Sequence, residues 1–471
     1  MVGFNLKGKK FMFVTGSSGR EKLLASIARE LKSRHNIDPY FLSLATGKTK
    51  IFFKEEGFDI SKVQSITTKP PKDKIPNMVF LREKEDQYGF NLFDLWQIAA
   101  PRHKRLLKFT DAHVLSWMET VIKEIESYIH KVKPDYAILN TISAFTYVIA
   151  FRIFLQKGIP TMELMNARIP GRFTFDAKFN SEWPLVVNKY NGIKKNGLTE
   201  SQRKRADNFV QNFRHKPVMP DNSTIVKETL SQRFYRYHGY GKTLLYRRNI
   251  PNLKPFIWYP IKDKFIKNSS RFEQPVPGEK YILYPLQTHP EASTSVRGKW
   301  YVNQIALIEN ISKSIPCDYK LYVKEHPRSI SKRPKGYHKE IKKFPNIRLI
   351  SPLSNTMDLI KNSDLIITVT GTPGWEAILH QKPVFTFGEV YYNIFDEVVK
   401  IKDYETLSSK IRQSLGVTID YEKTLQFIAA MDAGTYNGIA ALPNGCQNRS
   451  LKHTNIIKLV DGVEKYIEKI C

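Results

Sequence analysis

The residues best suited to chemistry follow an apolar run between Ser363 and Gly388. Leu365 to Val369 reads as a buried strand, and Thr370-Gly371-Thr372 follows it directly. The spacing predicts Thr372 as a helix N-cap with Pro373 at the first helical position, where its missing N–H costs nothing. The N-terminus of such a helix binds a phosphate or diphosphate through backbone N–H groups. Glu376, one turn further on, could reach a ribose hydroxyl. The plainer alternative is an ordinary capped helix.

A second polar cluster, Lys324-Glu325-His326-Pro327-Arg328, ends another expected strand that starts at Tyr319. His326 could donate a hydrogen bond to a phosphate leaving group and stabilise its developing charge. Pro285-Leu286-Gln287 ends a third strand, where the Gln287 amide could bind a base or a sugar. His289 is a rival to His326 for the same role, and a structural histidine is the alternative for both.

The N-terminal half offers weaker candidates. Gly16-Ser17-Ser18-Gly19-Arg20 follows the apolar run from Phe11 to Thr15, but it is neither a G-x-G-x-x-G fingerprint nor a Walker A loop. Asn166 and Arg168, after an expected strand from Pro160 to Leu164, are further candidates for acceptor contact. The alternative is that both segments are ordinary loops between a strand and a helix, with no role in binding.

A group transfer also needs a general base. The candidates Asp135, Glu163 and Asp176 are not ranked by the sequence. The chain has no D-x-D triad that would hold a metal-bound diphosphate. We therefore expect no metal and no cofactor, with a nucleotide sugar as co-substrate.

The elements that position these residues alternate along the chain. Apolar residues of the 21–33 segment recur at helical spacing between two short apolar runs, which predicts a βαβ unit. A helix from about Val114 to Val132, a strand at 136–139, a helix to Gln156 and a strand at 160–164 continue the pattern. From Lys280 onward strands and helices alternate again. The sequence thus predicts an α/β protein with two Rossmann-like, doubly wound domains.

We expect the first domain over residues 1–255, with a basic insertion at about 195–255. A proline-punctuated linker follows over 256–278, and the second domain covers 279–450. A C-terminal helix in 451–471 could pack back on the first domain. Such a pair of domains would face a cleft formed by the carboxyl ends of both sheets, where ligands of open α/β sheets bind.

The composition of the chain limits the kinds of ligand that its surface can attract. The 471 residues include 74 Lys+Arg and 45 Asp+Glu, a net charge of +29, and only three scattered cysteines. Residues 201–270 alone hold 15 Lys+Arg against 4 Asp+Glu. Such a surface attracts nucleic acid, anionic lipid or phosphorylated substrates. The Arg- and Tyr-rich stretch from Arg233 to Asn249 suits a membrane interface or single-stranded nucleic acid, with a solvated helix as the alternative.

The strand-end motifs together resemble the bacterial capsule polysaccharide biosynthesis family, which contains Kdo transferases. They are Pro285 to Gln287, Lys324 to Pro327, and the block from Asn362 to Gly388. The resemblance implies a two-domain GT-B glycosyltransferase that binds a nucleotide-activated sugar, often CMP-linked, through its C-terminal domain. It implies that His326-Pro327 engages the donor phosphate and nucleotide, and that Thr370, Gly371 and Thr372 form the capping loop. Glu376 matches the family's Glu-Ala pair, and Gln287 its strand-end Gln.

We therefore expect a cytoplasmic glycosyltransferase of capsule or surface glycolipid synthesis, peripheral at the inner face of the membrane. Its catalytic residues would be His326 and Glu376. Gln287, Lys324, Glu325, Pro327 and the 370–372 loop would bind the donor. The sequence contains no expected membrane span. Three alternatives stay open: a sugar-nucleotide epimerase, a non-catalytic partner in capsule assembly or export, and a nucleic-acid-binding protein.

Overall fold

The computed structural model describes residues 5–16, 20–44, 49–67, 71, 74–99, 109–139, 142, 144–178, 181–216, 271–327, 329–330, 333–440 and 447–470. The chain forms two compact units. Unit 1 comprises Met1–Thr224, Pro290–Val296 and Leu425–Cys471, and unit 2 comprises Ile225–His289 and Arg297–Thr424. Most of the predicted basic insertion and linker, including Arg233 to Asn249, lies outside the described residues.

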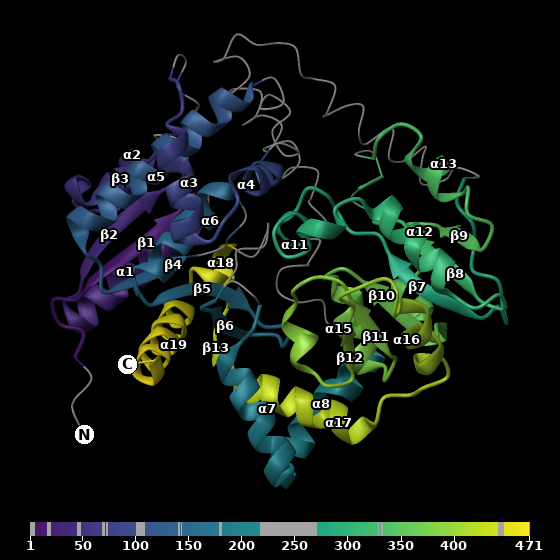
Figure 1. Cartoon of the computed structure of the whole chain (residues 1–471). Coiled ribbons are helices and arrows are strands. Elements are labelled where there is room, and N and C mark those ends of the chain that lie inside the picture. Colours follow the sequence, from purple (N-terminus) through teal and green to yellow (C-terminus); the bar gives the residue numbers. More distant parts are fainter. Residues whose placement is uncertain are drawn as a thin grey trace, which may run out of the picture. The chain divides into compact units, whose positions relative to one another are not determined.

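Unit 1 is built on a seven-stranded sheet with the order β13-β6-β5-β4-β1-β2-β3 (Figure 1). The strands are β1 (Lys10–Thr15), β2 (Asp38–Ser43), β3 (Val63–Ser65), β4 (Tyr136–Leu139), β5 (Thr161–Asn166), β6 (Arg172–Asp176) and β13 (Tyr436–Asn437). The five strands from β3 to β5 are parallel, whereas β6 pairs antiparallel with both β5 and β13. The order 3-2-1-4-5 is that of a doubly wound sheet.

Helices cover both faces of this sheet because the side chains of β1 alternate in direction. Phe11 and Phe13 pack with helices α1 (Arg20–His35) and α19 (His453–Ile470). Met12 and Val14 pack on the other face with α5 (Asp111–Val132) and α6 (Phe145–Gln156). The remaining helices of unit 1 in the described residues are α2 (Thr49–Glu55), α3 (Met78–Tyr88), α4 (Leu92–Ala99), α7 (Pro184–Asn196), α8 (Glu200–His215), α11 (Ala292–Ser295) and α18 (Gln447–Ser450), with the 3₁₀ turn η1 (Ile60–Lys62).

Unit 2 contains a six-stranded, fully parallel sheet with the order β12-β11-β10-β7-β8-β9. Its strands are β7 (Tyr281–Pro285), β8 (Lys320–Lys324), β9 (Ile347–Ile350), β10 (Leu365–Thr368), β11 (Val384–Thr386) and β12 (Val398–Lys400). Counted from β7, this is the order 3-2-1-4-5-6 of the Rossmann fold. The predicted fold class, two Rossmann-like α/β sheets, is confirmed.

The helices of unit 2 include α12 (Gln304–Ser314), α13 (Tyr337–Ile341) and α16 (Leu407–Ser414), whose apolar residues join a core on one face of the sheet. Helices α14 (Thr356–Asn362) and α15 (Thr372–Leu379) pack on each other, and α15 also packs on β10. The 3₁₀ turns η3 (Lys299–Tyr301) and η5 (Tyr391–Ile394) complete the described elements of this unit.

The division into units differs from the predicted boundary at residue 450. Helix α17 (Tyr421–Ala433) carries the chain out of unit 2, and the residues from Leu425 onward join unit 1. The physical reason is packing on α7 and β6. The ring of Phe427 lies 5.8 Å from that of Tyr190, and Asp432 pairs with Arg172 at 3.3 Å. Residues 290–296 also belong to unit 1.

None of the described helices combines the length and the apolar composition needed to cross a membrane.

Candidate functional site

The candidate site of unit 2 lies where the strand order reverses, between β7 and β10. In open parallel sheets, the carboxyl ends of the strands at this switch point hold the ligand. Gln287 follows β7, and its buried side chain crosses to the turn after β10. Its amide oxygen accepts hydrogen bonds from the backbone N–H groups of Thr370 at 2.7 Å and Gly371 at 2.9 Å. The sequence motifs around Gln287 and Thr370 are therefore brought together.

This contact corrects two predictions. Gln287 does not direct its amide at a base or a sugar, because the amide oxygen is occupied by the 370–371 turn. Helix α15 starts at Thr372 with Gly371 as its N-cap, so Thr372 is the first helical residue and not the cap. A side-chain cap is absent at Gly371; Thr368 Oγ1 and Gln287 from neighbouring strands take the Gly371 N–H instead. The N–H groups of Thr370 and Gly371 are thus engaged within the protein, and the α15 terminus retains its dipole.

Tyr392 holds the turn from the other side. Its hydroxyl donates to the carbonyl oxygen of Gly371 at 2.6 Å. A Cβ at Gly374 would lie 2.4 Å from that hydroxyl, and a Cβ at Gly371 would lie 2.6 Å from Thr368 Oγ1. Both glycines are therefore required by close packing, and the turn is rigidly built.

His326, at the end of the neighbouring strand β8, is half-buried. Its Nδ1 lies 3.2 Å from the hydroxyl of Thr288, which in turn accepts a hydrogen bond from Ser329 at 2.9 Å. This chain of hydroxyls favours the neutral tautomer with the proton on Nε2. His326 can then donate from Nε2 to an anionic ligand. The sequence offered no signal for the roles of Thr288 and Ser329.

Glu325 is fully buried, which corrects its prediction as a donor ligand. Its carboxylate accepts hydrogen bonds from Arg333 at 2.8 Å and from His338 at 2.6 Å. Burial acts to raise the pKa of Glu325, but the hydrogen bonds from His338 and Arg333 outweigh it and lower the pKa below the usual range. Its carboxylate also accepts the backbone N–H of His326 at 2.5 Å. Glu325 is thus a positioning residue that fixes the start of the His326 loop.

Lys324 and Glu376 are buried charged residues of unit 2. Lys324 is 4% exposed, and its ammonium donates to the carbonyl of Pro352 at 3.4 Å. Burial lowers the pKa of Lys324 to about 8, although the charges of Glu325 and Glu376 oppose the shift. Glu376 is itself buried at 8% exposure, inside α15. Pro327 is exposed, and Thr370, Thr372 and His289 are half-buried.

The candidates of unit 1 are less closely assembled. Gly16 follows β1, and a Cβ there would overlap the hydroxyl of Tyr147 at 1.9 Å. Ser17, Ser18 and Gly19 lie outside the described residues, and Arg20 begins α1. Asn166 accepts the backbone N–H of Ala440 at 2.8 Å, which is a structural contact. Arg168 is half-buried two residues further on.

The structure separates the three candidate bases. Asp135 precedes β4 and accepts hydrogen bonds from Lys9 and the backbone of Lys10, so it lies at the amino edge of the sheet, opposite the edge that binds ligands. Glu163 and Asp176 are cross-strand neighbours in β5 and β6, and both are buried. Glu163 accepts the N–H of Ile142 at 2.9 Å, and Asp176 that of Ser181 at 3.0 Å.

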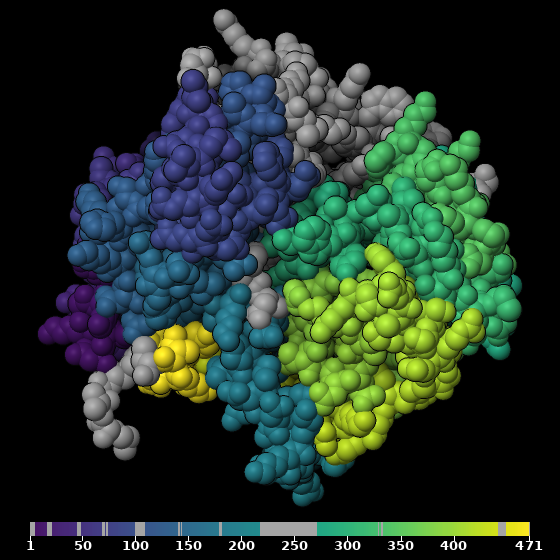
Figure 2. All heavy atoms as spheres, viewed as in Figure 1, coloured from purple at the N-terminus to yellow at the C-terminus, as the bar shows by residue number. Residues whose placement is uncertain are grey.

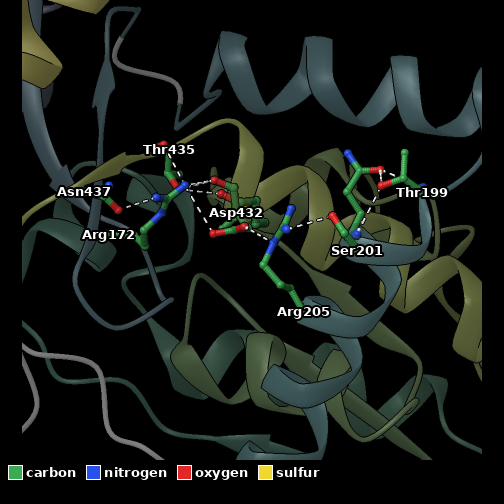
Figure 3. Close-up of polar contacts among 9 residues, drawn as sticks. Arg172, Thr199, Ser201, Arg205, Asp432, Thr435 and Asn437 are labelled. Atoms are coloured by element: carbon green, nitrogen blue, oxygen red, sulfur yellow. Dashed lines mark hydrogen bonds and ion pairs between the residues drawn. The ribbon is translucent and has the colours of Figure 1, made fainter.

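An arginine network in unit 1 escaped the sequence analysis. Arg172 of β6 donates to Asn437 at 2.6 Å and to the carbonyl of Thr435 at 3.0 Å, and it pairs with Asp432, which also pairs with Arg205 of α8 (Figure 3). A cavity of about 340 Å³ between α8 and α17 borders this network. The partners of Arg172 are about 260 residues away in sequence, so no local pattern indicates the network.

Comparisons with known proteins agree with the strand-end motifs. Residues 190–396 match the family described as capsule polysaccharide biosynthesis protein. Protein FixF of Sinorhizobium fredii is 29% identical over 138 residues, which is 28% of this chain and 32% of FixF. The capsule polysaccharide modification protein LipA of Neisseria meningitidis serogroup B is 33% identical over 89 residues, 19% of this chain and 12% of LipA. The chain thus spans less than a third of the length of these curated relatives.

A solved structure described as Thermosulfurimonas dismutans KpsC, beta Kdo 2,4 transferase, is 16% identical, with a TM-score of 0.40. The similarity covers 70% of this chain and 87% of that one. The fold assignment itself depends on the strand orders described above. By fold, the chain is a protein of two Rossmann-like sheets with a polar cluster at the switch point of the second. Residues 190–396 of this chain are similar to the capsule polysaccharide biosynthesis family.

Proposed function

We propose that the chain is a glycosyltransferase that takes a sugar from a nucleotide donor, with a CMP-linked Kdo-type sugar favoured, to build a capsule or another surface glycan. One observation carries the proposal: side chains from the ends of β7, β8 and β10 converge at the switch point of unit 2. The contacts Gln287–Thr370 and Thr288–His326 join these three strand ends. The family match covers all of these residues.

In this proposal the donor phosphate lies at the switch point, where three groups stabilise its negative charge. His326 donates a hydrogen bond from Nε2, the start of α15 contributes the positive end of its dipole, and Lys324 contributes a buried positive charge. These interactions strengthen as the sugar leaves and charge builds on the phosphate, so they lower the barrier to transfer. The negative charges of Glu325 and Glu376 favour the protonated form of Lys324, so Glu376 acts as a positioning residue. Glu163 or Asp176 of unit 1 remains a proposed base.

A thermal-shift panel of CMP, CDP, UDP, GDP and TDP tests the donor site. A nucleotide at 100 times its dissociation constant adds ~2.7 kcal/mol of stability to the folded protein. We expect one nucleotide to stabilise the wild type and the exposed control His130→Ala equally, and to leave His326→Ala unshifted. A shift that is lost in His289→Ala and kept in His326→Ala would assign the role to the rival histidine.

Two outcomes would contradict the proposal. The absence of a shift with every nucleotide would favour a non-catalytic partner or a nucleic-acid-binding protein. Conversion of a nucleotide sugar without any acceptor would favour an epimerase. Product analysis by mass spectrometry, with and without a saccharide acceptor, separates transfer from epimerisation.

We also propose that the enzyme works at an anionic membrane surface, where a lipid-linked acceptor would lie. The charge excess of residues 201–270 supports this, because basic segments are attracted to anionic lipid. Liposome flotation should then show binding to anionic vesicles that salt weakens. Equal binding to neutral and anionic vesicles would contradict it.

A further inference from the structure

A cavity of about 690 Å³ in unit 2 is lined by the segment 333–339 together with parts of the chain on either side of it. Its volume lies within the range of about 300–1,000 Å³ that is common for small-molecule sites. Gln287, Lys324, His326, Thr370 and Glu376 are not among its lining residues. Helix α13, which forms one wall, lies at the surface of unit 2 in the upper right of Figures 1 and 2.

The lining of this cavity is strongly cationic. Its charged members all carry positive charge: Arg271, Arg333, Lys335, Lys339 and Lys342. Two of them are compensated, since Arg333 pairs with Glu325 at 2.8 Å and Lys342 pairs with Glu273 at 3.4 Å. The side chains of Arg271, Lys335 and Lys339 have no carboxylate or hydrogen-bond partner within the described part of the chain. Three positive charges around one cavity are thus left for a ligand.

The two compensated cations are held in place by contacts with neighbouring residues. Arg333 donates to Glu325 and to the carbonyl of Gln287 at 3.1 Å, and its guanidinium lies 5.0 Å from the ring centre of Tyr337. Lys342 donates to the carbonyl of Arg271 at 3.3 Å. The bonds of Arg333 are thus partly buried, while Lys335, Lys339 and Lys342 are exposed. A ligand with several negative charges spread along its length would match this arrangement.

The lining argues against a membrane surface and against single-stranded nucleic acid as the ligand. A membrane site would present large apolar side chains to lipid, and none of the exposed large apolar residues in the described chain lines the cavity. Single-stranded nucleic acid binds by stacking its bases on open aromatic faces. The one aromatic ring of the described lining other than His338 is Tyr337, which is covered by Arg333 and meets His338 edge-on.

We propose that this cavity is a second binding site of unit 2, which holds an acidic oligosaccharide through Arg271, Lys335 and Lys339. The choice of a saccharide rests on the proposed function, whereas the anion site itself does not. A carboxylate-bearing saccharide supplies negative charges at sugar-ring spacing without needing a stacking surface. The site would hold an acidic acceptor or product chain, apart from the donor.

Isothermal titration calorimetry with tetragalacturonate as the acidic probe and maltotetraose as the neutral probe tests the proposal. The test variant is Lys335→Gln/Lys339→Gln. Its control, Lys361→Gln/Lys402→Gln, removes the same charge from exposed lysines of unit 2 that do not line the cavity. We expect tetragalacturonate to bind wild type and control alike, and to bind the test variant about tenfold more weakly, as loss of two exposed ion pairs implies. Maltotetraose should not bind.

Three results would overturn the proposal. The first is equal affinity of the test variant and the control for tetragalacturonate. The second is equal affinity of the wild type for both probes. The third is binding of phosphatidylglycerol vesicles or a thymidine decamer that is tighter than binding of tetragalacturonate and that the test variant loses. The nucleotide shift should be the same in the test variant and wild type. A normal nucleotide shift with no saccharide binding would reject this site alone. Saccharide binding without any nucleotide shift would reject the proposed donor site alone.

Discussion

The hydroxyl of Thr288 lies 3.2 Å from Nδ1 of His326, and the two residues follow neighbouring strands of the second sheet. This bond orients the imidazole and, when the hydroxyl donates to Nδ1, favours the tautomer with the proton on Nε2. Thr288 is buried at 6% exposure, so its main effect is on His326 and not on a ligand.

We therefore expect Thr288→Val to weaken nucleotide binding, because the imidazole loses the partner that orients Nε2. A neutral hydrogen bond contributes about 0.5–1.5 kcal/mol, which corresponds to roughly 2- to 12-fold in the dissociation constant. Titration calorimetry measures this change. Thr288→Ser keeps the hydroxyl and should restore binding, together with the pH dependence of the wild type. Weak binding in both variants would mean that the methyl group matters, not the hydroxyl.

Lys324 should make stability depend on pH above neutrality. Its pKa is lowered to about 8 in the folded protein by burial, whereas an unfolded lysine keeps its proton to about 10.5. Between these values the unfolded chain binds more protons, so the free energy of unfolding rises with pH. Relative to Lys324→Met, the wild type should gain about 2 kcal/mol from pH 8 to about pH 9.5. Urea unfolding of both proteins at several pH values measures this gain. If the free energy of unfolding depends on pH in the same way in both proteins, the lowered pKa of Lys324 is contradicted.

The buried group Glu325–Arg333–His338 should be costly to break. Arg333→Gln leaves the Glu325 carboxylate buried without its arginine, which costs about 3–5 kcal/mol in comparable cases. Lys343→Gln, which removes an exposed pair with Glu340, should change the unfolding free energy little. Because the pKa of Glu325 is lowered, its contribution is present above the usual glutamate pKa of 4.5 and is lost as the pH falls through the lowered value. Denaturant unfolding at neutral and acidic pH should show this loss in the wild type and little of it in Arg333→Gln.

Two glycines in helices of unit 1, one closely packed and one not, can be compared by substitution with alanine. A Cβ at Gly462 in α19 would lie 2.4 Å from the ring of Phe173, whereas nothing lies within 4 Å of a Cβ at Gly192 in α7. Gly462→Ala should destabilise unit 1 by about 1–3 kcal/mol through overpacking. Gly192→Ala should stabilise it by roughly 0.5–1 kcal/mol, the usual helix-propensity gain. Thermal unfolding compares them, and a gain in both would show that α19 can shift away from the sheet.

The buried strands and the order of the elements could be predicted because apolar runs are bounded by polar residues. The strands at 136–139 and 347–350 have the predicted bounds. The predicted N-cap of α15, Thr372, is one residue later than the observed one, Gly371. The general preference for a threonine cap predicted Thr372. It does not reveal that the distant Gln287 accepts hydrogen bonds from the N–H groups of the turn. Similarly, Glu325 resembled a ligand because its partners, Arg333 in a loop and His338 in α13, follow it without regular spacing. Contacts that depend on tertiary packing leave no periodic signal.

The path of the chain also affects the order in which the protein can fold. Unit 1 begins with β1 and α1, yet α19 supplies Leu459, Val460 and Val463 to the same core and packs directly on α1. During synthesis, the ribosome must therefore finish all of unit 2 before α19 can complete this core. Until then the surface that α19 covers in the folded protein stays open, so apolar side chains of the first unit are exposed for most of the time of its translation.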